Sequence, residues 1–435
     1  MSGGVVYMAA TSGSNPMRMT SLQYGTNVAH VIRGVQVSGG SCTVGPMAAD
    51  ASPVDYEITS AFTFTPSSAR TFLMGGDYSR LNMQLQGGAS YKEGGVTKDA
   101  IDIAVDNGWN IVRLRVFNDP GNKGYSPSSY MSPGFVNKAD ALRLAAKAKA
   151  AGMEILLTFH YSDYWTNPGV QNIPHDWNGK NFNQLKAAIY DFTKDVLDDM
   201  NAQGTLPAYV SIGNETNSGL LFGGGTEGTN YNSYNCDYEK YVAFFNQGAQ
   251  AVRDVSSAIK VVTHLTSPNG TASYVLGQMN TYEADYDVIG ISYYPFWTET
   301  MMASDFCSQA DSWASTYGKD VLIMETAVNW NTITYYGDAG QLTNQGAYES
   351  IYPASAENQR NYLQEIINQI KMSDSVIGLI YWDPVTVKLS TWNYTYYGTS
   401  GTISNYDNGT INQNAALFDF NGNRLPAWDA FKYNN

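Results

Sequence analysis

From about residue 71, short apolar runs alternate with segments in which apolar residues recur every three to four positions. Short runs with almost no polar residues are typical of strands in a parallel sheet that is covered on both faces. Eight such runs lie at residues 71–75, 110–117, 154–160, 208–213, 260–265, 288–293, 321–325 and 377–382. The eightfold repeat of strand and helix predicts an α/β fold, a (β/α)8 TIM barrel.

The intervening segments carry helical signals. Residues 139–151 are rich in Ala and Lys, and they are bounded by Asn137 and Gly152, which are suitable capping residues. Apolar residues also recur at helical spacing from Leu185 to Val196 and from Tyr362 to Ile370. A doubly wound open sheet is the alternative fold, but eight repeats without a Gly-rich phosphate-binding turn favour the barrel.

Residues 1–70 do not share this alternation. They hold short β-rich pieces at 29–37 and 56–64 between clusters of Gly, Ser and Pro, and they are too short for a whole β-sandwich. We therefore expect a β-rich segment at 1–70 followed by the barrel at 71–435. The segment is either the remnant of an accessory β-sandwich module or an N-terminal extension packed on the barrel.

Composition narrows the class of protein. Lys and Arg total 25 against 39 Asp and Glu, which gives a net charge of −14. Nucleic acid and anionic membranes require a basic surface, so neither is an expected partner. No apolar run approaches the ~18 residues that cross a bilayer, so we expect no membrane span. Aromatic residues reach 13 % and charged residues only 15 %, a balance common in extracellular proteins that handle sugars.

The cysteines and histidines do not form a metal-binding motif. Cys42, Cys236 and Cys307 are widely spaced and indicate neither a disulfide framework nor a zinc site, although a bridge between Cys236 and Cys307 stays open. The four histidines are too far apart in sequence for a paired-ligand motif, and we expect no cofactor. The first residues lack the basic and apolar parts of an export signal, so export would depend on a signal upstream.

Two predicted strands end in a glutamate. The fourth strand runs into Asn214 and Glu215, and the seventh ends at Glu325. Because the carboxyl ends of barrel strands meet at one face, both carboxylates are expected in the same mouth. Glycoside hydrolysis needs such a pair, one to protonate the leaving oxygen and one to attack the sugar or activate water. An ionised nucleophile also raises the pKa of its neighbour, which keeps that neighbour protonated near neutral pH.

Other strand ends carry residues suited to a carbohydrate site. Arg113 and Arg115 share one face of the second strand, where they either pair with Glu325 or form a structural salt bridge. Aromatic side chains stack on pyranose rings, and such residues gather after the third, sixth and eighth strands. The polar and aromatic residues expected there are His160, Asp163, Trp165, Tyr293, Tyr294, Trp297 and Trp382.

Several long motifs match a known family in order. They are GGDYS (75–79), RLRVFNDP (113–120), HYSDYWTNPG (160–169), IGNET (212–216), SYYPFW (292–297), ET (325–326), YWDP (381–384) and ALFDFNGNRLP (416–426). Through them the chain from about residue 70 to residue 431 resembles the arabinogalactan endo-β-1,4-galactanases of glycoside hydrolase family 53. The resemblance implies a retaining, endo-acting enzyme that cuts β-1,4-galactan, the side chain of type I arabinogalactan in pectin, by double displacement.

The resemblance also implies roles for single residues. Glu215 would be the acid/base and Glu325 the nucleophile, which Arg113 or Arg115 would support together with Tyr293. The sugar beside the scissile bond would contact an amide and an aromatic floor, Asn214 and Trp382. The residues lining the cleft would be Asp77, His160, Asp163, Trp165 and His264.

The chain departs from the family pattern in places. The family's Trp-Glu-Pro is Trp382-Asp383-Pro384 in this chain. Some bacterial members bind calcium through a histidine in the loop after the seventh strand, and this loop has no histidine here, so calcium binding is not expected. Two alternatives stay open. One is an endo-glycanase of the same clan acting on mannan, xylan or glucan, and the other is a catalytically inactive glycan-binding barrel. We expect a monomer that acts on a polysaccharide, extracellular or at the cell surface or in the periplasm.

Overall fold

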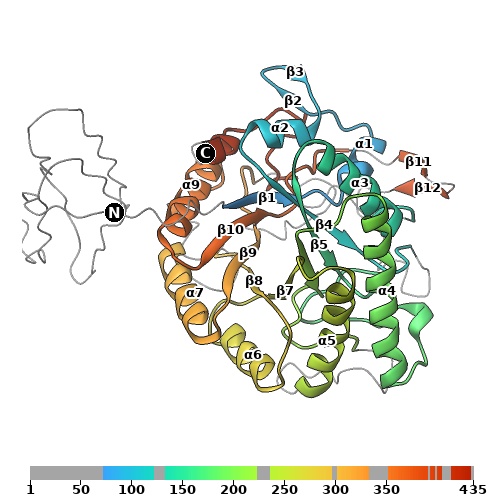
Figure 1. Ribbon diagram of the computed structural model, residues 1–435. Helices are drawn as coiled ribbons and strands as arrows, with labels where there is room; N and C mark the ends of the chain where they lie inside the picture. Colours follow the sequence, from blue (N-terminus) through green and yellow to red (C-terminus); the bar gives the residue numbers. More distant parts are fainter. Residues whose placement is uncertain are drawn as a thin grey trace, which may run out of the picture. The chain divides into compact units, whose positions relative to one another are not determined.

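The barrel predicted from the eight apolar runs is confirmed. The computed structural model describes residues 72–121, 133–222, 236–295, 301–332, 351–389, 392–396, 399–403 and 413–432. Eight parallel strands close into a ring that helices surround (Figure 1). In their order around the ring the strands are β1 (Leu73–Asp77), β4 (Ile111–Val116), β5 (Glu154–Phe159), β6 (Tyr209–Ile212), β7 (Lys260–Leu265), β8 (Val288–Ser292), β9 (Asp320–Thr326) and β10 (Val376–Tyr381).

Helices on the outside connect successive strands. Those that precede each next strand are α2 (Ala100–Asp106), α3 (Lys138–Ala150), α4 (Phe182–Ala202), α5 (Tyr238–Val255), α6 (Gly270–Thr281), α7 (Ala303–Tyr317) and α9 (Ala356–Met372). Shorter elements are α1 (Leu81–Gln86), η1 (His175–Trp177), η2 (Pro426–Trp428) and α10 (Asp429–Lys432). The chain thus repeats strand and helix around the ring, as the periodicity predicts.

The ends of α3 show why the sequence forms a helix there. The Asn137 side chain accepts a hydrogen bond from the amide of Asp140, which satisfies one of the free N–H groups of the first turn. Lys147 and Lys149 in the last turn complement the helix dipole. Gly152 follows with φ +80°, a conformation that glycine adopts without strain.

Strand alternation divides the core into two parts. Inward residues fill the inside of the barrel and form one buried cluster: Leu73, Ile111, Leu156, Val262, Val288, Leu322, Met324, Ile377 and Ile380. Outward residues pack against the helices in a larger cluster that includes Val112, Leu114 and Leu363. The inward cluster closes the barrel from below, so that polar residues further along the same strands line its carboxyl-terminal end.

Two short antiparallel hairpins lie outside the ring of eight strands. One pairs β2 (Lys92–Glu93) with β3 (Val96–Thr97), and the other pairs β11 (Trp392–Tyr396) with β12 (Thr399–Ile403). The second lies within the segment that follows β10. The alternation of aromatic and polar residues from Trp392 to Tyr396 is the signal that indicates this strand.

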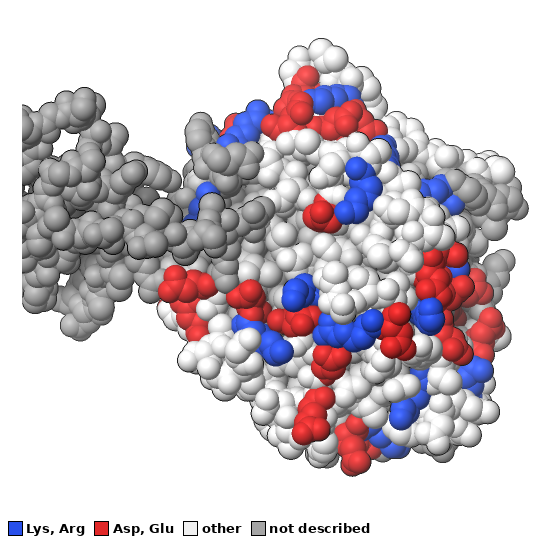
Figure 2. Space-filling model, in the orientation of Figure 1, with Lys and Arg blue, Asp and Glu red and all other residues white. Residues whose placement is uncertain are grey.

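Several sequence predictions lie outside the described residues. These are the β-rich segment at 1–70, Trp297 and Cys42. The thiols of Cys236 and Cys307 are both free, so the bridge left open between them is not formed. Within the described ranges, every helix is too short or too polar to cross a bilayer. Figure 2 shows acidic and basic side chains intermixed over the visible face.

Candidate active site

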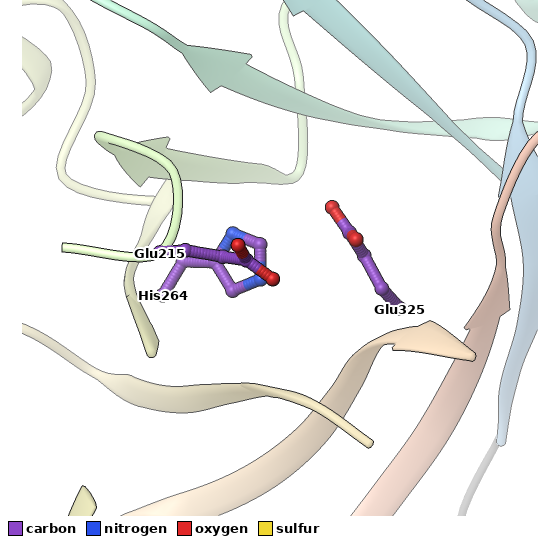
Figure 3. Close-up of side chains that lie close together, drawn as sticks. All are labelled: Glu215, His264 and Glu325. Carbon is purple, nitrogen blue, oxygen red and sulfur yellow. The ribbon is translucent and has the colours of Figure 1, made fainter. Parts of the chain in front are cut away.

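Glu215 and Glu325 meet at the carboxyl-terminal end of the barrel. Glu215 follows β6, and Glu325 lies near the end of β9. A carboxylate oxygen of each residue and a ring nitrogen of His264 all lie within 4.8 Å of one another. Figure 3 shows Glu215 beside His264, with the Glu325 carboxylate facing them. The two acidic groups, 110 positions apart in the chain, therefore form one site.

The backbone before Glu215 is in an uncommon conformation. Glu215 has φ +49° and Gly213 has φ +87°. A Cβ atom at position 213 would lie 2.4 Å from the Cγ2 atom of Thr216 and 2.9 Å from the Cδ2 atom of Leu220. A glutamate in the left-handed region costs of order 1–3 kcal/mol, and such conformations concentrate at functional sites. The tight turn after β6 is what directs the Glu215 side chain into the mouth.

A β-bulge directs Glu325 into the same mouth. On β8, Ile291 and Ser292 pair with Ile323 and Glu325, so one residue of β9 is skipped in the register. Met324 faces the interior cluster, and strict alternation would turn Glu325 to the outside. The extra residue resets the alternation, and Glu325 faces inward directly after Met324.

Arg113 holds Glu325 in place. Its guanidinium is fully buried and forms an ion pair with the Glu325 carboxylate through Nη1. The same group donates from Nη2 to Oδ1 of Asn214 at 2.6 Å and from Nε to Oγ1 of Thr158 at 3.1 Å. Tyr294 donates its hydroxyl to the second oxygen of Glu325 at 3.0 Å. Both oxygens of Glu325 thus accept hydrogen bonds, which stabilises its negative charge.

The surroundings of Glu215 favour its protonated form. Burial and the neighbouring charge of Glu325 raise the pKa of Glu215 to about 8, while a hydrogen bond from Ser292 and the charge of Arg113 act in the opposite direction. Glu215 therefore holds its proton near neutral pH, whereas the Glu325 carboxylate is paired with the guanidinium of Arg113. This is the difference that an acid and a nucleophile require.

Arg115 does not reach Glu325. It pairs instead with Asp77 at 3.0 Å and with Asp383 at 3.1 Å, and Arg80 pairs with Asp383 at 3.3 Å. Asp77 also lies 3.7 Å from Arg113 and is fully buried. Asp77, which was expected to line the cleft, is thus buried within a network of ion pairs with the two arginines of β4. Of the two alternatives for Arg115, the structure shows the structural salt bridge. The ion pairs of Arg115 hold Asp77 in place next to Arg113.

His160 and Trp165 pack close to these ion pairs. The His160 ring stacks on Phe117 with centroids 4.2 Å apart, and the Trp165 ring covers the guanidinium of Arg115 at 4.3 Å and that of Arg80 at 4.9 Å. Burial and the charges of the arginines lower the pKa of His160 well below its usual value, so its ring is neutral. Trp165 remains partly exposed at the mouth.

Two sequence-predicted residues contact neighbouring loops. Both oxygens of Asp163 accept backbone N–H groups, from Asp119 at 2.9 Å and from His175 at 2.7 Å, so this carboxylate ties together the segments after β4 and β5. Tyr293, which was expected to support the nucleophile, donates its backbone N–H to the carbonyl of Glu325 at 2.8 Å. Its hydroxyl donates to the carbonyl of Met301. Ser292 and Tyr294 face inward and Tyr293 between them faces outward, because side chains alternate along an extended chain.

Trp382, Asn214 and His264 complete the described mouth. Trp382 directly follows β10 and is partly exposed, while Nδ2 of Asn214 donates to the carbonyl of Thr166 at 2.8 Å. The second hydrogen of that amide is available for a sugar hydroxyl. His264 is buried and neutral, because burial and Arg113 lower its pKa, and its Nε2 atom lies 2.9 Å from the Ser292 hydroxyl.

Sequence reasoning missed Ser292 and Asp383 as parts of the site, and it missed Tyr294 as the tyrosine that contacts Glu325. Ser292 opens the motif SYYPFW, and the alternation of β8 places it on the same face as Tyr294. Asp383 was treated only as a departure from the family pattern. Its role depends on contacts with Arg80 and Arg115 that no local signal reveals.

The cluster of Glu215, His264 and Glu325 has donor atoms close enough to hold a metal ion. Glu325 is already paired with Arg113, and Glu215 is protonated near neutral pH. The set therefore offers little net negative charge, and a divalent cation would lie beside a guanidinium. The arrangement fits proton transfer and nucleophilic attack better than cation binding. Of the loop considered for calcium, residues 329–346, positions 333–346 lie outside the described ranges.

Comparisons with known proteins show the family of this chain. Residues 73–431 match the model of glycosyl hydrolase family 53. The arabinogalactan endo-beta-1,4-galactanase of Cellvibrio japonicus is 33 % identical over 83 % of this chain and 90 % of its own, and the endo-beta-1,4-galactanase of Bacillus subtilis is 30 % identical over 84 % and 86 %. A solved GH53 catalytic domain from Ignisphaera aggregans superposes with a TM-score of 0.71 at 29 % identity, over 84 % of this chain and 97 % of that one. The chain described here belongs to glycosyl hydrolase family 53.

Proposed function

We propose that the protein is a retaining endo-β-1,4-galactanase that hydrolyses galactan by double displacement. The observation that carries the proposal is the close approach, within 4.8 Å, of an ion-paired Glu325 and a protonated Glu215. A separation of about 5–5.5 Å between carboxyl groups is typical of retaining enzymes, whereas inverting enzymes need about 6.5–9.5 Å to admit a water molecule. One oxygen of Glu215 and one of Glu325 lie within 4.8 Å of each other, which favours the closer, retaining arrangement and supports direct attack by Glu325.

In the first step, an oxygen of Glu325 attacks the anomeric carbon, and Glu215 transfers its proton to the glycosidic oxygen. The bond to the leaving sugar breaks, and a covalent glycosyl-enzyme forms. Arg113 and Tyr294 orient Glu325 for this attack through its two oxygens. Asn214, held by Arg113, offers its free amide hydrogen to the sugar at the same point.

In the second step, Glu215 is ionised and acts as a base. It takes a proton from water while the water oxygen attacks the anomeric carbon, and the bond to Glu325 breaks. Two inversions leave the product with the configuration of the substrate. Glu215 is then protonated again and Glu325 is free, so the enzyme returns to its starting state.

The names of the relatives indicate galactan as the substrate, and the aromatic residues Trp165 and Trp382 at the mouth suit a chain of sugar rings. Endo-glycanases of the same clan share the carboxylate pair, so the pair alone does not select galactan. We expect the protein to act on this polysaccharide as a monomer outside the cytoplasm, in pectin degradation.

The test is product analysis on linear β-1,4-galactan with anomer-resolved NMR. We expect short galacto-oligosaccharides whose new reducing ends first appear as the β-anomer. The variants Glu215→Gln and Glu325→Gln should each lose more than 99 % of turnover, in line with the ~10²–10⁴-fold contribution of acid–base groups. First appearance of the α-anomer, or faster release from mannan, xylan or β-glucan than from galactan, would overturn the proposal.

A further inference from the structure

Ser292 lies between the acid/base and a buried histidine. It is the last residue of β8 and is 1 % exposed. Its side chain neighbours the carboxyl group of Glu215 and lowers the pKa of that group, and its oxygen lies 2.9 Å from Nε2 of His264, whose ring lies within 4.8 Å of the same carboxyl group. Three side chains from three different strand ends therefore form a continuous chain, His264 to Ser292 to Glu215.

The direction of this chain follows from the neutral His264 ring. A neutral imidazole carries one proton, on Nε2 or on Nδ1. Nδ1 is buried and has no hydrogen-bond partner among the described residues. A buried N–H without an acceptor is less tolerable than an unpaired acceptor. The proton therefore lies on Nε2, and Nε2–H donates to the oxygen of Ser292.

Since His264 donates to Ser292, the single hydroxyl proton of Ser292 is directed to Glu215. This arrangement serves both states of the acid/base. When Glu215 is protonated, its second oxygen accepts from Ser292, so its own O–H is free to point at the glycosidic oxygen. When Glu215 is ionised, the same bond stabilises the carboxylate, and hydrogen bonds to charged acceptors are the stronger ones.

We propose that Ser292, held by His264, is a positioning residue that keeps the proton of Glu215 directed at the leaving oxygen and stabilises the carboxylate left after proton transfer. This inference rests on the proposed acid/base role of Glu215. The other charged or titratable groups that face Glu215 are Glu325 on β9, Arg113 on β4 and Tyr294 after β8. None of them changes in a variant at position 292, so an effect on Glu215 can be assigned to the hydroxyl.

The experiment compares the pH dependence of kcat/KM for the full chain and its Ser292→Ala variant on galactan. The basic limb of the profile reports loss of the proton from Glu215, and the limb should disappear in the residual activity of Glu215→Gln. In Ser292→Ala we expect this limb to move upward by about one pH unit, as loss of a hydrogen bond to a charged group implies, and kcat to fall about tenfold.

Two further variants separate positioning from packing. Ser292→Thr keeps the hydroxyl and should restore the wild-type limb. Thr263→Val is the control for packing. It removes a buried hydroxyl next to His264, but this hydroxyl faces Met279 and not the mouth, so the pH profile should not change. His264→Phe should raise the limb by less than Ser292→Ala does. The double variant with both Ser292→Ala and His264→Phe should show no shift of the basic limb beyond that of Ser292→Ala alone, because both residues act on Glu215 through the same hydroxyl.

An unshifted basic limb in Ser292→Ala would overturn the inference, whether or not kcat falls. If Ser292→Ala does not fold, as judged by its thermal transition, the limb of His264→Phe decides in the same way. Failure of the proposed function is a separate result, because it appears in the wild-type chain as an inverted product or as no reaction with galactan.

Discussion

Arg113 and Glu325 form a buried ion pair in which the guanidinium also holds Asn214. One Nη atom contacts the Glu325 carboxylate and the other donates to Oδ1 of Asn214 at 2.6 Å. The expected nucleophile and the residue beside the expected acid are thus fixed by one planar group from β4. Because β4, β6 and β9 have fixed positions in the barrel, the contacts of Arg113 set the spacing between Glu325 and Asn214.

The variant Arg113→Lys should lower kcat/KM on galactan at least 100-fold. A lysine keeps the charge, but its ammonium group cannot make the three hydrogen bonds of the guanidinium fork to Glu325, Asn214 and Thr158. Initial rates of reducing-end release measure the effect. Arg143→Lys, at a partly exposed pair with Asp140, is the matched control and should stay within twofold of wild type. Comparable losses in both variants would argue against a special role for Arg113.

Activity should decline as the pH rises through about 8. The pKa of Glu215 is raised to about 8, and its proton is needed in the first step. Removing that proton inactivates the acid, so the decline lies on the alkaline side of the profile. Measurement of kcat/KM between pH 6 and 10 tests this. A basic limb near the ordinary glutamate pKa would show that Glu215 does not have the environment described.

The raised pKa of Glu215 also predicts an effect on stability. The folded state binds this proton up to about pH 8, whereas an unfolded chain releases it near pH 4.5. Stability therefore falls as the pH rises between these values. Glu215→Gln removes this cost, and we expect its Tm to exceed that of wild type by about 2 °C or more at pH 8.

The same comparison at pH 4 is the control, because wild-type Glu215 is protonated in both states there. The difference in Tm between Glu215→Gln and wild type should shrink toward zero. A gain at pH 4 as large as at pH 8 would mean that the substitution stabilises through packing and not through charge.

The variant Gly213→Ala should lose most of its activity. Its Cβ atom would lie 2.4 Å from Thr216, and the turn that carries Asn214 and Glu215 would have to shift. Gly152 has a similar φ of +80° but open space around a new Cβ, which makes Gly152→Ala a matched control. Both variants should lose about 1 kcal/mol of stability from backbone strain, and only Gly213→Ala should lower kcat. Equal kcat values would contradict the positioning role of this turn.

The variant Asp383→Asn should destabilise the fold by about 3–5 kcal/mol, because Arg80 and Arg115 would each lose a buried carboxylate. Urea unfolding followed by fluorescence measures this loss. Asp198→Asn, at an exposed pair with Lys194, should cost less than about 0.5 kcal/mol. Similar midpoints for the two variants would show that the buried network adds little.

The barrel and the positions of its acidic residues along the chain could be predicted from local sequence patterns. Apolar runs and helical periodicity are local consequences of burial on both faces of a parallel sheet, so the eight strands could be found without coordinates. The family motifs around Glu215 and Glu325 were likewise readable from the chain. For the helix at α3, even the capping residues were evident.

Which side chains contact one another depends on the closed barrel and could not be predicted from local patterns. Strict alternation would turn Glu325 outward, and the bulge after Ile323 that turns it inward depends on pairing with two neighbouring strands. Arg113 and Arg115 share a strand face, yet only Arg113 reaches Glu325, because Asp77 and Asp383 lie nearer to Arg115. Periodicity reports the face of a residue, whereas its partner depends on register and distance across the closed barrel.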